Sequence, residues 1–482
     1  MKLTANWSYP TSVRFGAGRI AELAEAAKTA GMTRPLLVTD PRLATMPMVK
    51  KALDLLVEQK LDAAVFSDIK PNPVASNVEA GIKALREGKH DGVIAFGGGS
   101  ALDAGKVVAF MAGQTRPMWD FEDVGDWWTR ADPKGIAPIV AVPTTAGTGS
   151  EVGRAGVITD ETTHTKKVIF HPLMMPKVTI CDPELTVGMP PTITAGTGMD
   201  ALAHCLEAYC GPFYHPLADG ISVEGMRLVK ENLGFAYADG TNLTARAHMM
   251  SAAAMGATAF QKALGAIHAL SHPVGALYDT HHGLTNAVFM PYVLMFNRPA
   301  IEPKIERLAA YLGLQPSFDA FLDWILKLRS DVGVPHTLKA FGVDDTKFDL
   351  MSKMAPKDPT PAATPLPTRR RPSAASCTRR RIQGNCERPS PFWTPTEGLA
   401  DLKCEPGTWV ARLGPWVPAR TRVMRSHAPH GRSLGRDDKV VGGCAMLLST
   451  VIPGKRGPNE AFGRTASIPA RDPGPSATRG SM

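Results

Sequence analysis

The sequence predicts an α/β domain over residues 1–182, an all-helical domain over residues 183–355 and an extension over residues 356–482 that belongs to neither. In the first part, short apolar runs alternate with amphipathic helical stretches, which is typical of α/β folds. The second part loses this alternation and is rich in Ala, Leu, Met and His at helical spacing. The third part is rich in Pro, Arg, Ser, Thr and Gly without a sustained period, and we expect it to be disordered.

Four apolar segments of the first domain have the length and composition of buried strands. They are residues 35–40, 63–67, 92–96 and 138–142. A helix is expected over residues 77–87, and Ser76 followed three residues later by Glu79 resembles a capping box at its start. Strands that alternate with helices favour a mostly parallel sheet that is covered on both faces.

The formal net charge of +9 is concentrated at one end of the chain. From Pro356 onward the sequence holds 21 Lys and Arg against 9 Asp and Glu, a net charge of +12, so the first 355 residues carry −3. Prolines interrupt this basic segment, and aromatic residues do not alternate regularly with its charges. We therefore do not expect it to bind nucleic acid.

The cysteines and the N-terminus indicate a soluble protein of a reducing compartment. The seven cysteines include no CxxC pair, and their odd number argues against a disulfide framework. No apolar signal-peptide core follows Met1, and no apolar run reaches the roughly 18 residues that a membrane helix needs. We expect a cytoplasmic location and no membrane association.

A glycine triplet at the end of one strand is a candidate phosphate-binding loop. Gly97, Gly98, Gly99 and Ser100 follow the strand at 92–96 and open a helix. Glycines let a backbone approach a diphosphate closely, and a helix N-terminus offers free N–H groups and a positive dipole end. By itself such a triplet could equally be a plain turn, but its position between strand and helix favours a ligand-binding role.

Two other strands also end in polar residues. Thr144, Thr145 and Thr148 follow the strand at 138–142, and their hydroxyls suit phosphates, a ribose or an amide, or simply a solvated turn. Asp40 is the last residue of the first expected strand, where a carboxylate can bind ribose hydroxyls and repel a 2′-phosphate. A helix N-cap or a turn residue is an equally good interpretation of Asp40.

The helical domain carries the strongest chemical signal. Asp200 and His204 are four residues apart and therefore share one face of a helix. His268 and His272 repeat this spacing, and a His-His-Gly turn follows at 281–283. A single histidine is more often structural than a ligand, but two such pairs in one apolar domain are unusual. One carboxylate and three imidazoles can bind Fe²⁺ or Zn²⁺ and leave a position for a substrate oxygen.

At these residues the chain resembles the iron-containing (group III) alcohol dehydrogenases, from about residue 12 to about residue 353. The resemblance rests on GGGSALDAGK, PTTAGTGSEV, the run from CDPELTVGMPP to GMDALAHCLEAY, and HALSHPVGALYDTHHG. It implies a nucleotide-binding α/β domain and a helical metal domain with the active site between them.

The resemblance also implies roles for individual residues. The metal ligands would be Asp200, His204, His268 and His282, and His272 would relay a proton beside the substrate. The carboxylate at Asp40 resembles NAD-preferring members. The implied NAD contacts are Asp40, Asn72, Gly97, Gly98, Gly99, Ser100, Thr144, Thr145, Thr148, Val157 and Lys166.

The implied activity is the interconversion of an alcohol with an aldehyde or ketone by hydride transfer with NAD(H), supported by Fe²⁺ or alternatively Zn²⁺. We expect a homodimer or a larger homo-oligomer. A hydroxyacid–oxoacid transhydrogenase is an alternative. So is an inactive product, because the sequence departs from the family after about Pro359 and lacks its final helix. The composition beyond that point resembles a GC-rich gene read in the wrong frame.

Overall fold

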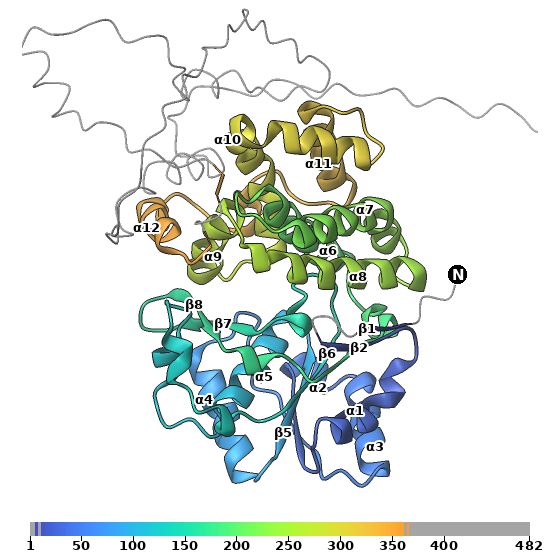
Figure 1. The fold of residues 1–482 in the computed structure, drawn as a ribbon, viewed down its shortest axis with the longest axis vertical. Coiled ribbons are helices and arrows are strands. Elements are labelled where there is room, and N and C mark those ends of the chain that lie inside the picture. Colours follow the sequence, from blue (N-terminus) through green and yellow to red (C-terminus); the bar gives the residue numbers. More distant parts are fainter. Residues whose placement is uncertain (1–4, 8–10, 361–363, 366–482) are drawn as a thin grey trace, which may run out of the picture.

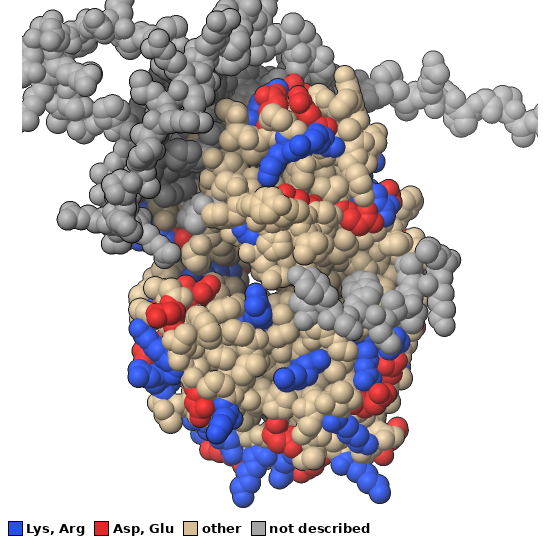
Figure 2. Space-filling view, viewed as in Figure 1, with Lys and Arg blue, Asp and Glu red and all other residues tan. Residues whose placement is uncertain are grey.

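The computed structural model describes residues 5–7, 11–360 and 364–365, which form a sheet domain and a helical domain (Figure 1). The disorder expected for residues 356–482 therefore falls almost entirely outside the described residues. Figure 2 shows acidic and basic side chains interspersed over the sheet domain on one face of the molecule. None of the described helices is long and apolar enough to cross a membrane.

A seven-stranded sheet forms the centre of the first domain, in the order β1-β2-β9-β6-β5-β3-β4. Only β1 runs antiparallel to its neighbour, and the other pairs are parallel. The four expected strands are β3 to β6, and the parallel α/β fold is confirmed. The expected burial of residues 63–67 was wrong, because β4 is an edge strand and Val65 is exposed. The strands are β1 (Ala5–Trp7), β2 (Ser12–Phe15), β3 (Pro35–Val38), β4 (Ala64–Phe66), β5 (Gly92–Gly97), β6 (Ile139–Pro143) and β9 (Val178–Cys181).

Helices and a hairpin surround this sheet. Every residue of β3, β5, β6 and β9 is buried, as expected for parallel strands covered on both faces. The hairpin of β7 (Ala155–Asp160) and β8 (Thr165–Phe170) is a separate two-stranded sheet. The helices of this domain are α1 (Leu23–Thr29), α2 (Pro41–Ala44), α3 (Pro47–Glu58), α4 (Ala75–Glu87) and α5 (Gly99–Met111).

The start of α4 differs from the expected capping box. The helix begins at Ala75, and the Asn77 side chain accepts a hydrogen bond from the backbone N–H of Val74 at 3.2 Å. Ser76 lies inside the helix and donates to Glu161 instead. The capping role of Ser76 and Glu79 was wrong because the chain enters the helix two residues earlier than the apolar pattern indicates.

The second domain is all helical, as predicted, and is built around α6 (Pro191–Cys210). Every residue of α6 from 194 to 210 is buried, because other helices pack around it. A helix that is buried all round must carry small or apolar residues on most faces, so its few polar side chains stand out. The remaining helices are α7 (Pro216–Ala238), α8 (Leu243–Ala259), α9 (Ala266–Tyr278), α10 (His282–Tyr311), α11 (Phe318–Asp331) and α12 (Phe348–Met354).

Candidate active site

The central helix α6 presents two polar side chains toward α9 and the start of α10. Asp200 and His204 are one helical turn apart and only 2% and 4% exposed. Gly283, the second residue of α10, lets that helix approach α6. A Cβ atom there would collide with the carbonyl oxygen of Gly196 and lie 3.0 Å from Cβ of Asp200. This contact brings His282, the first residue of α10, beside Asp200.

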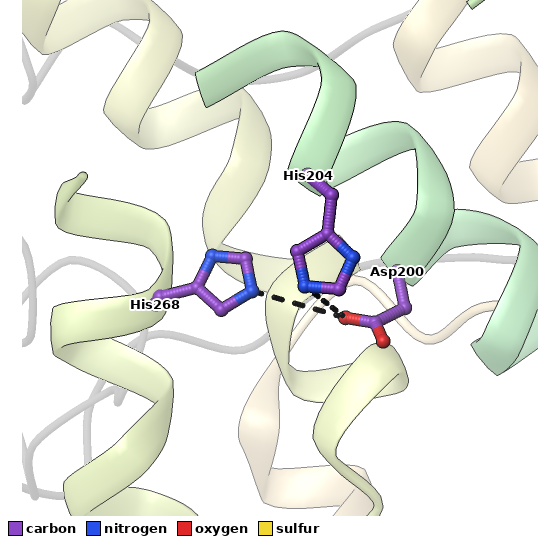
Figure 3. Close-up of side chains that lie close together, drawn as sticks. All are labelled: Asp200, His204 and His268. Atoms are coloured by element: carbon purple, nitrogen blue, oxygen red, sulfur yellow. Dashed lines mark ion pairs between the residues drawn. The ribbon is translucent and has the colours of Figure 1, made fainter. Parts of the chain in front are cut away.

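Three imidazole nitrogens surround one carboxylate oxygen. The Nε2 atoms of His204 and His268 each lie 4.0 Å from Oδ1 of Asp200, and Nε2 of His282 lies 3.6 Å from the same oxygen. Figure 3 shows Asp200, His204 and His268, whose ligand atoms all lie within 4.8 Å of one another. The structure thus brings together the four residues that the sequence suggested as metal ligands.

The chemistry of this cluster suits a cation. Burial lowers the pKa of His204 to about 4, and it lowers that of His282 well below its ordinary value, so both imidazoles keep a free lone pair. The Asn286 amide nitrogen donates to Oδ1 of Asp200 at 2.8 Å and lies 3.3 and 3.1 Å from Nε2 of His268 and His282. Its own Oδ1 has no hydrogen-bond partner among the described residues. The ligand atoms therefore converge on a positively polarised group, and a metal ion fits the same surroundings.

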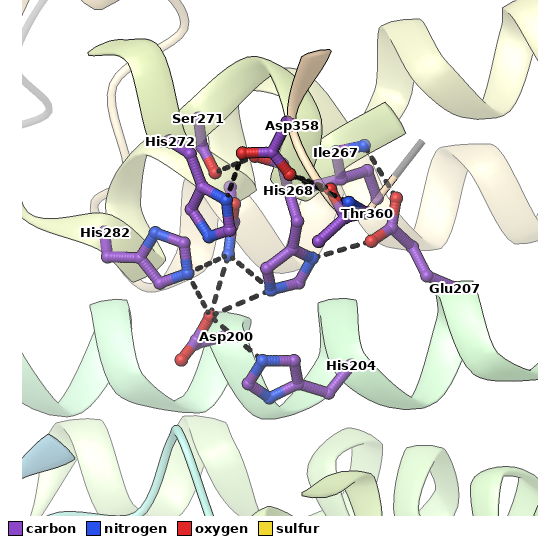
Figure 4. Close-up of polar contacts among 11 residues, drawn as sticks. Asp200, His204, Glu207, Ile267, His268, Ser271, His272, His282, Asp358 and Thr360 are labelled. Atoms are coloured by element: carbon purple, nitrogen blue, oxygen red, sulfur yellow. Dashed lines mark hydrogen bonds and ion pairs between the residues drawn. The ribbon is translucent and has the colours of Figure 1, made fainter. Parts of the chain in front are cut away.

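Two buried carboxylates, which the sequence analysis did not identify, contact the two histidines of α9 (Figure 4). Nδ1 of His268 bonds to Oε2 of Glu207 at 2.6 Å, and Nδ1 of His272 bonds to Oδ2 of Asp358 at 2.7 Å. Burial lowers the pKa of His268, but the bond to Glu207 outweighs it and the net shift is upward. Burial raises the pKa of Asp358, but His272 and Thr360 outweigh it and the net shift is downward.

The two histidines of the His-His-Gly turn have different surroundings. His282 joins the cluster, whereas Nδ1 of His281 accepts a hydrogen bond from the backbone N–H of Leu284 at 3.3 Å and caps α10. His272 is not bonded to Asp200, and its ring stacks on that of His282 with centroids 5.3 Å apart. His272 therefore lies next to the cluster without belonging to it.

The glycine loop (residues 97–100) and the threonine loop (residues 144–148) pack against each other at the ends of β5 and β6. The backbone N–H of Thr144 donates to the carbonyl of Gly97 at 2.9 Å. A Cβ atom at Gly99 would lie 2.5 Å from Cγ2 of Thr148, so this close approach requires glycine. Gly99 is also the first residue of α5, and the helix N-terminus expected from the sequence is present at this loop.

The α5 side chains hold the neighbouring segments. Asp103 accepts a hydrogen bond from the backbone N–H of Val157 at 3.0 Å and another from the Ser150 hydroxyl. Lys106, which is 1% exposed, donates to the carbonyl of Ser150 at 3.0 Å. These bonds hold Val157 of the hairpin against α5, one helical turn beyond Gly99.

The remaining predicted cofactor contacts also lie at the edge of the sheet domain. Asp40 caps α2 by accepting hydrogen bonds from the backbone N–H groups of Arg42 and Leu43 at 3.0 and 2.9 Å. Lys166 donates to Oδ1 of Asn72 at 2.8 Å, and the Asn72 amide donates to Asp279 of the helical domain at 2.5 Å. The chain from Lys166 through Asn72 to Asp279 therefore bridges the two domains.

Two family models match this chain along most of its length. Residues 10–183 match the family model described as iron-containing alcohol dehydrogenase, and residues 194–372 match the one described as Fe-containing alcohol dehydrogenase family, C-terminal. A 4-hydroxybutyrate dehydrogenase of Cupriavidus necator is 38% identical over 352 residues, which cover 71% of this chain and 90% of the relative.

Solved structures share the fold. A 1,3-propanediol oxidoreductase is 34% identical, with a TM-score of 0.70 over 80% of this chain and 99% of that one. A sulfoacetaldehyde reductase of Bifidobacterium kashiwanohense, solved in complex with NAD⁺, is 29% identical, with a TM-score of 0.67 over 76% and 95% of the two chains.

Proposed function

The chain belongs to the iron-containing alcohol dehydrogenase family and interconverts an alcohol with an aldehyde or ketone using NAD(H), and we propose that Asp200, His204, His268 and His282 hold its metal. One observation carries this proposal. Three imidazole nitrogens from three helices lie 3.6–4.0 Å from the same carboxylate oxygen. We further propose Fe²⁺ as the metal, with Zn²⁺ as the alternative, because both accept mixed nitrogen and oxygen ligands.

The reaction requires the substrate hydroxyl to lose its proton as the hydride leaves carbon. When bound, the metal supplies a Lewis acid that lowers the pKa of that hydroxyl. The nicotinamide supplies or accepts the hydride. His272 lies beside His282 without being one of the four proposed ligands, so its imidazole is placed to take up the hydroxyl proton and pass it on.

We propose that NAD lies along the edge where β5, β6 and β3 end. Gly97, Gly98, Gly99 and Ser100 at the start of α5 would hold its pyrophosphate, because a helix N-terminus favours negative charge. Asp40 would favour NAD over NADP by repelling a 2′-phosphate. The other proposed contacts are Asn72, Thr144, Thr145, Thr148, Val157 and Lys166.

We also propose a cytoplasmic location, a homo-oligomeric assembly and a domain division near residues 182 and 355. The transhydrogenase alternative is not favoured, because the relatives are named dehydrogenases, reductases or oxidoreductases. The inactive alternative depends on residues that are almost all outside those described.

Steady-state kinetics of the full chain, loaded with Fe²⁺ or Zn²⁺ in turn, test the function. We expect continuous consumption of free NADH with at least one member of a panel of small aldehydes, slower consumption of NADPH, and loss of both after chelation. Exchange between a hydroxyacid and an oxoacid without net NADH consumption would instead support the transhydrogenase. No turnover with either metal would support the inactive product.

A further inference from the structure

We propose that two buried carboxylates, Glu207 and Asp358, give the two histidines of α9 their different tasks. The inference rests on the proposed function, in which His268 is a metal ligand and His272 carries a proton. The two histidines are one turn apart on the same helix and are both largely buried, so sequence spacing does not separate their roles. Their carboxylate partners come from different parts of the chain (Figure 4).

Glu207 fixes the orientation of His268. The Glu207 side chain lies on α6 one turn beyond His204 and accepts two hydrogen bonds of 2.6 Å, from Nδ1 of His268 and from the backbone N–H of Ile267. Because a carboxylate only accepts, Nδ1 carries a proton, and Nε2 is the nitrogen that is left to bind a metal beside Asp200. The bond to Ile267 holds the first turn of α9 against α6, and this keeps Nε2 of His268 close to Asp200.

Asp358 holds His272 in the same tautomer but in a different place. Its Oδ2 accepts from Nδ1 of His272 at 2.7 Å, and its Oδ1 accepts from the backbone N–H and the hydroxyl of Thr360 at 3.0 and 2.5 Å. The Asp358 side chain is 6% exposed. In the neutral ring the lone pair is therefore on Nε2 of His272, and this is the atom that can accept a proton.

The two pairs differ in their relation to the metal cluster. Nε2 of His268 lies 4.0 Å from Oδ1 of Asp200, whereas His272 is bonded to Asp358 and contacts the cluster through the ring of His282. Residues that hold a ligand histidine commonly change metal affinity by about 10–100-fold when they are replaced. A residue that holds a proton carrier acts on turnover instead. Glu207 and Asp358 are thus positioning residues for two separate properties.

The test compares Glu207→Gln with Asp358→Asn, each of which serves as the control for the other. Zn²⁺ affinity is measured by chelator competition on the metal-free full chain, and kcat and KM are measured at saturating metal. We expect Glu207→Gln to weaken Zn²⁺ binding by about 10–100-fold, as for other partners of ligand histidines, and Asp358→Asn to leave it unchanged. Asp358→Asn should lower kcat by roughly tenfold or more with little change in KM, within the range of a general acid–base contribution.

Conservative variants separate positioning from folding. Asp358→Glu should recover part of the lost kcat, and Glu207→Asp part of the lost Zn²⁺ affinity, while circular dichroism monitors the fold. Equal metal loss in Asp358→Asn and Glu207→Gln, or unchanged Zn²⁺ affinity in Glu207→Gln, would overturn the inference. His268→Ala distinguishes this failure from that of the proposed function: if it binds Zn²⁺ as tightly as the wild type, the ligand set itself is wrong.

Discussion

At the scale of single residues, the site depends on which nitrogen or oxygen faces which neighbour. The Nε2 atoms of His204, His268 and His282 all lie near one carboxylate oxygen of Asp200. His272 and His281 are bonded elsewhere. Residue identity therefore does not decide a role by itself. The partner of each imidazole does.

Replacing the two histidines of α9 should have different consequences. We expect His268→Ala to remove most of the bound metal and abolish turnover, because the remaining ligands hold the ion too weakly. His272→Ala should keep the metal and slow catalysis, because it removes a proton carrier and leaves the ligands intact. Metal analysis beside steady-state kinetics checks both, and equal metal loss in the two variants would contradict the division of roles.

A buried glutamate that closely follows the threonine loop should make stability depend on pH. Glu151 is 2% exposed, and burial raises its pKa to about 7. The folded state then binds more protons than the unfolded state between about pH 4.5 and 7, so the free energy of unfolding falls as pH rises through this window. Above pH 7 the free energy of unfolding is lower than below pH 4.5 by on the order of 3 kcal/mol, at about 1.4 kcal/mol per pKa unit.

Glu151→Gln should remove this loss. The difference in the free energy of unfolding between the variant and the wild type should shift in favour of the variant as the pH rises from 5 to 8. Chemical unfolding of both proteins at these two pH values measures it. Glu79→Gln on the exposed face of α4 is the matched control. A stability difference for Glu151→Gln that is the same at both pH values would show that the carboxylate does not change its charge there.

At the scale of helices and strands, periodic signals predicted most of the fold. The strands β3 to β6 and the helix α4 were located from apolar runs and helical spacing alone. The start of α4 was not, because Asn77 caps the helix from inside its first turn. Glu207 and Asn286 could have been found, since they lie three and four residues after His204 and His282. Asp358 could not, because it is 86 residues from His272 and only tertiary folding brings them together.

The packing of α5 against the threonine loop gives a prediction for cofactor binding. Gly99→Ala places a methyl group 2.5 Å from Cγ2 of Thr148, so the two loops must move apart. We expect the KM for NADH to rise by roughly tenfold, which corresponds to about 1.4 kcal/mol. Gly234→Ala on the exposed face of α7 meets open space and is the control, with unchanged KM and up to about 1 kcal/mol of added stability. An unchanged KM in Gly99→Ala would argue against this loop as the NAD site.

At the scale of the whole molecule, the folded body extends past the boundary that composition indicates at residue 355. Asp358 and Thr360 make specific hydrogen bonds in the helical domain, and the family match continues to residue 372. A change in composition marks where the sequence pattern ends. It does not mark the last residue that contributes to the site.

Two truncations test where the enzyme ends. A chain that stops after Pro365 keeps Asp358, so we expect it to retain the metal affinity and kcat of the full chain. A chain that stops after Ala355 loses the partner of His272 and should have a lower kcat with its metal affinity preserved. Activity assays and thermal unfolding of both forms check this. Loss of folding in the longer truncation would show that the segment beyond Pro365 is a necessary part of the structure.

The most direct test of the account is a crystal structure of the Zn²⁺-loaded protein with the metal located by anomalous scattering. We predict one peak about 2.0–2.2 Å from a carboxylate oxygen of Asp200 and from Nε2 of His204, His268 and His282. The Asn286 amide nitrogen, which now lies 3.1–3.3 Å from two of these nitrogens, should have turned away. A peak coordinated by His272 or His281, or no peak among these helices, would contradict the proposed metal centre.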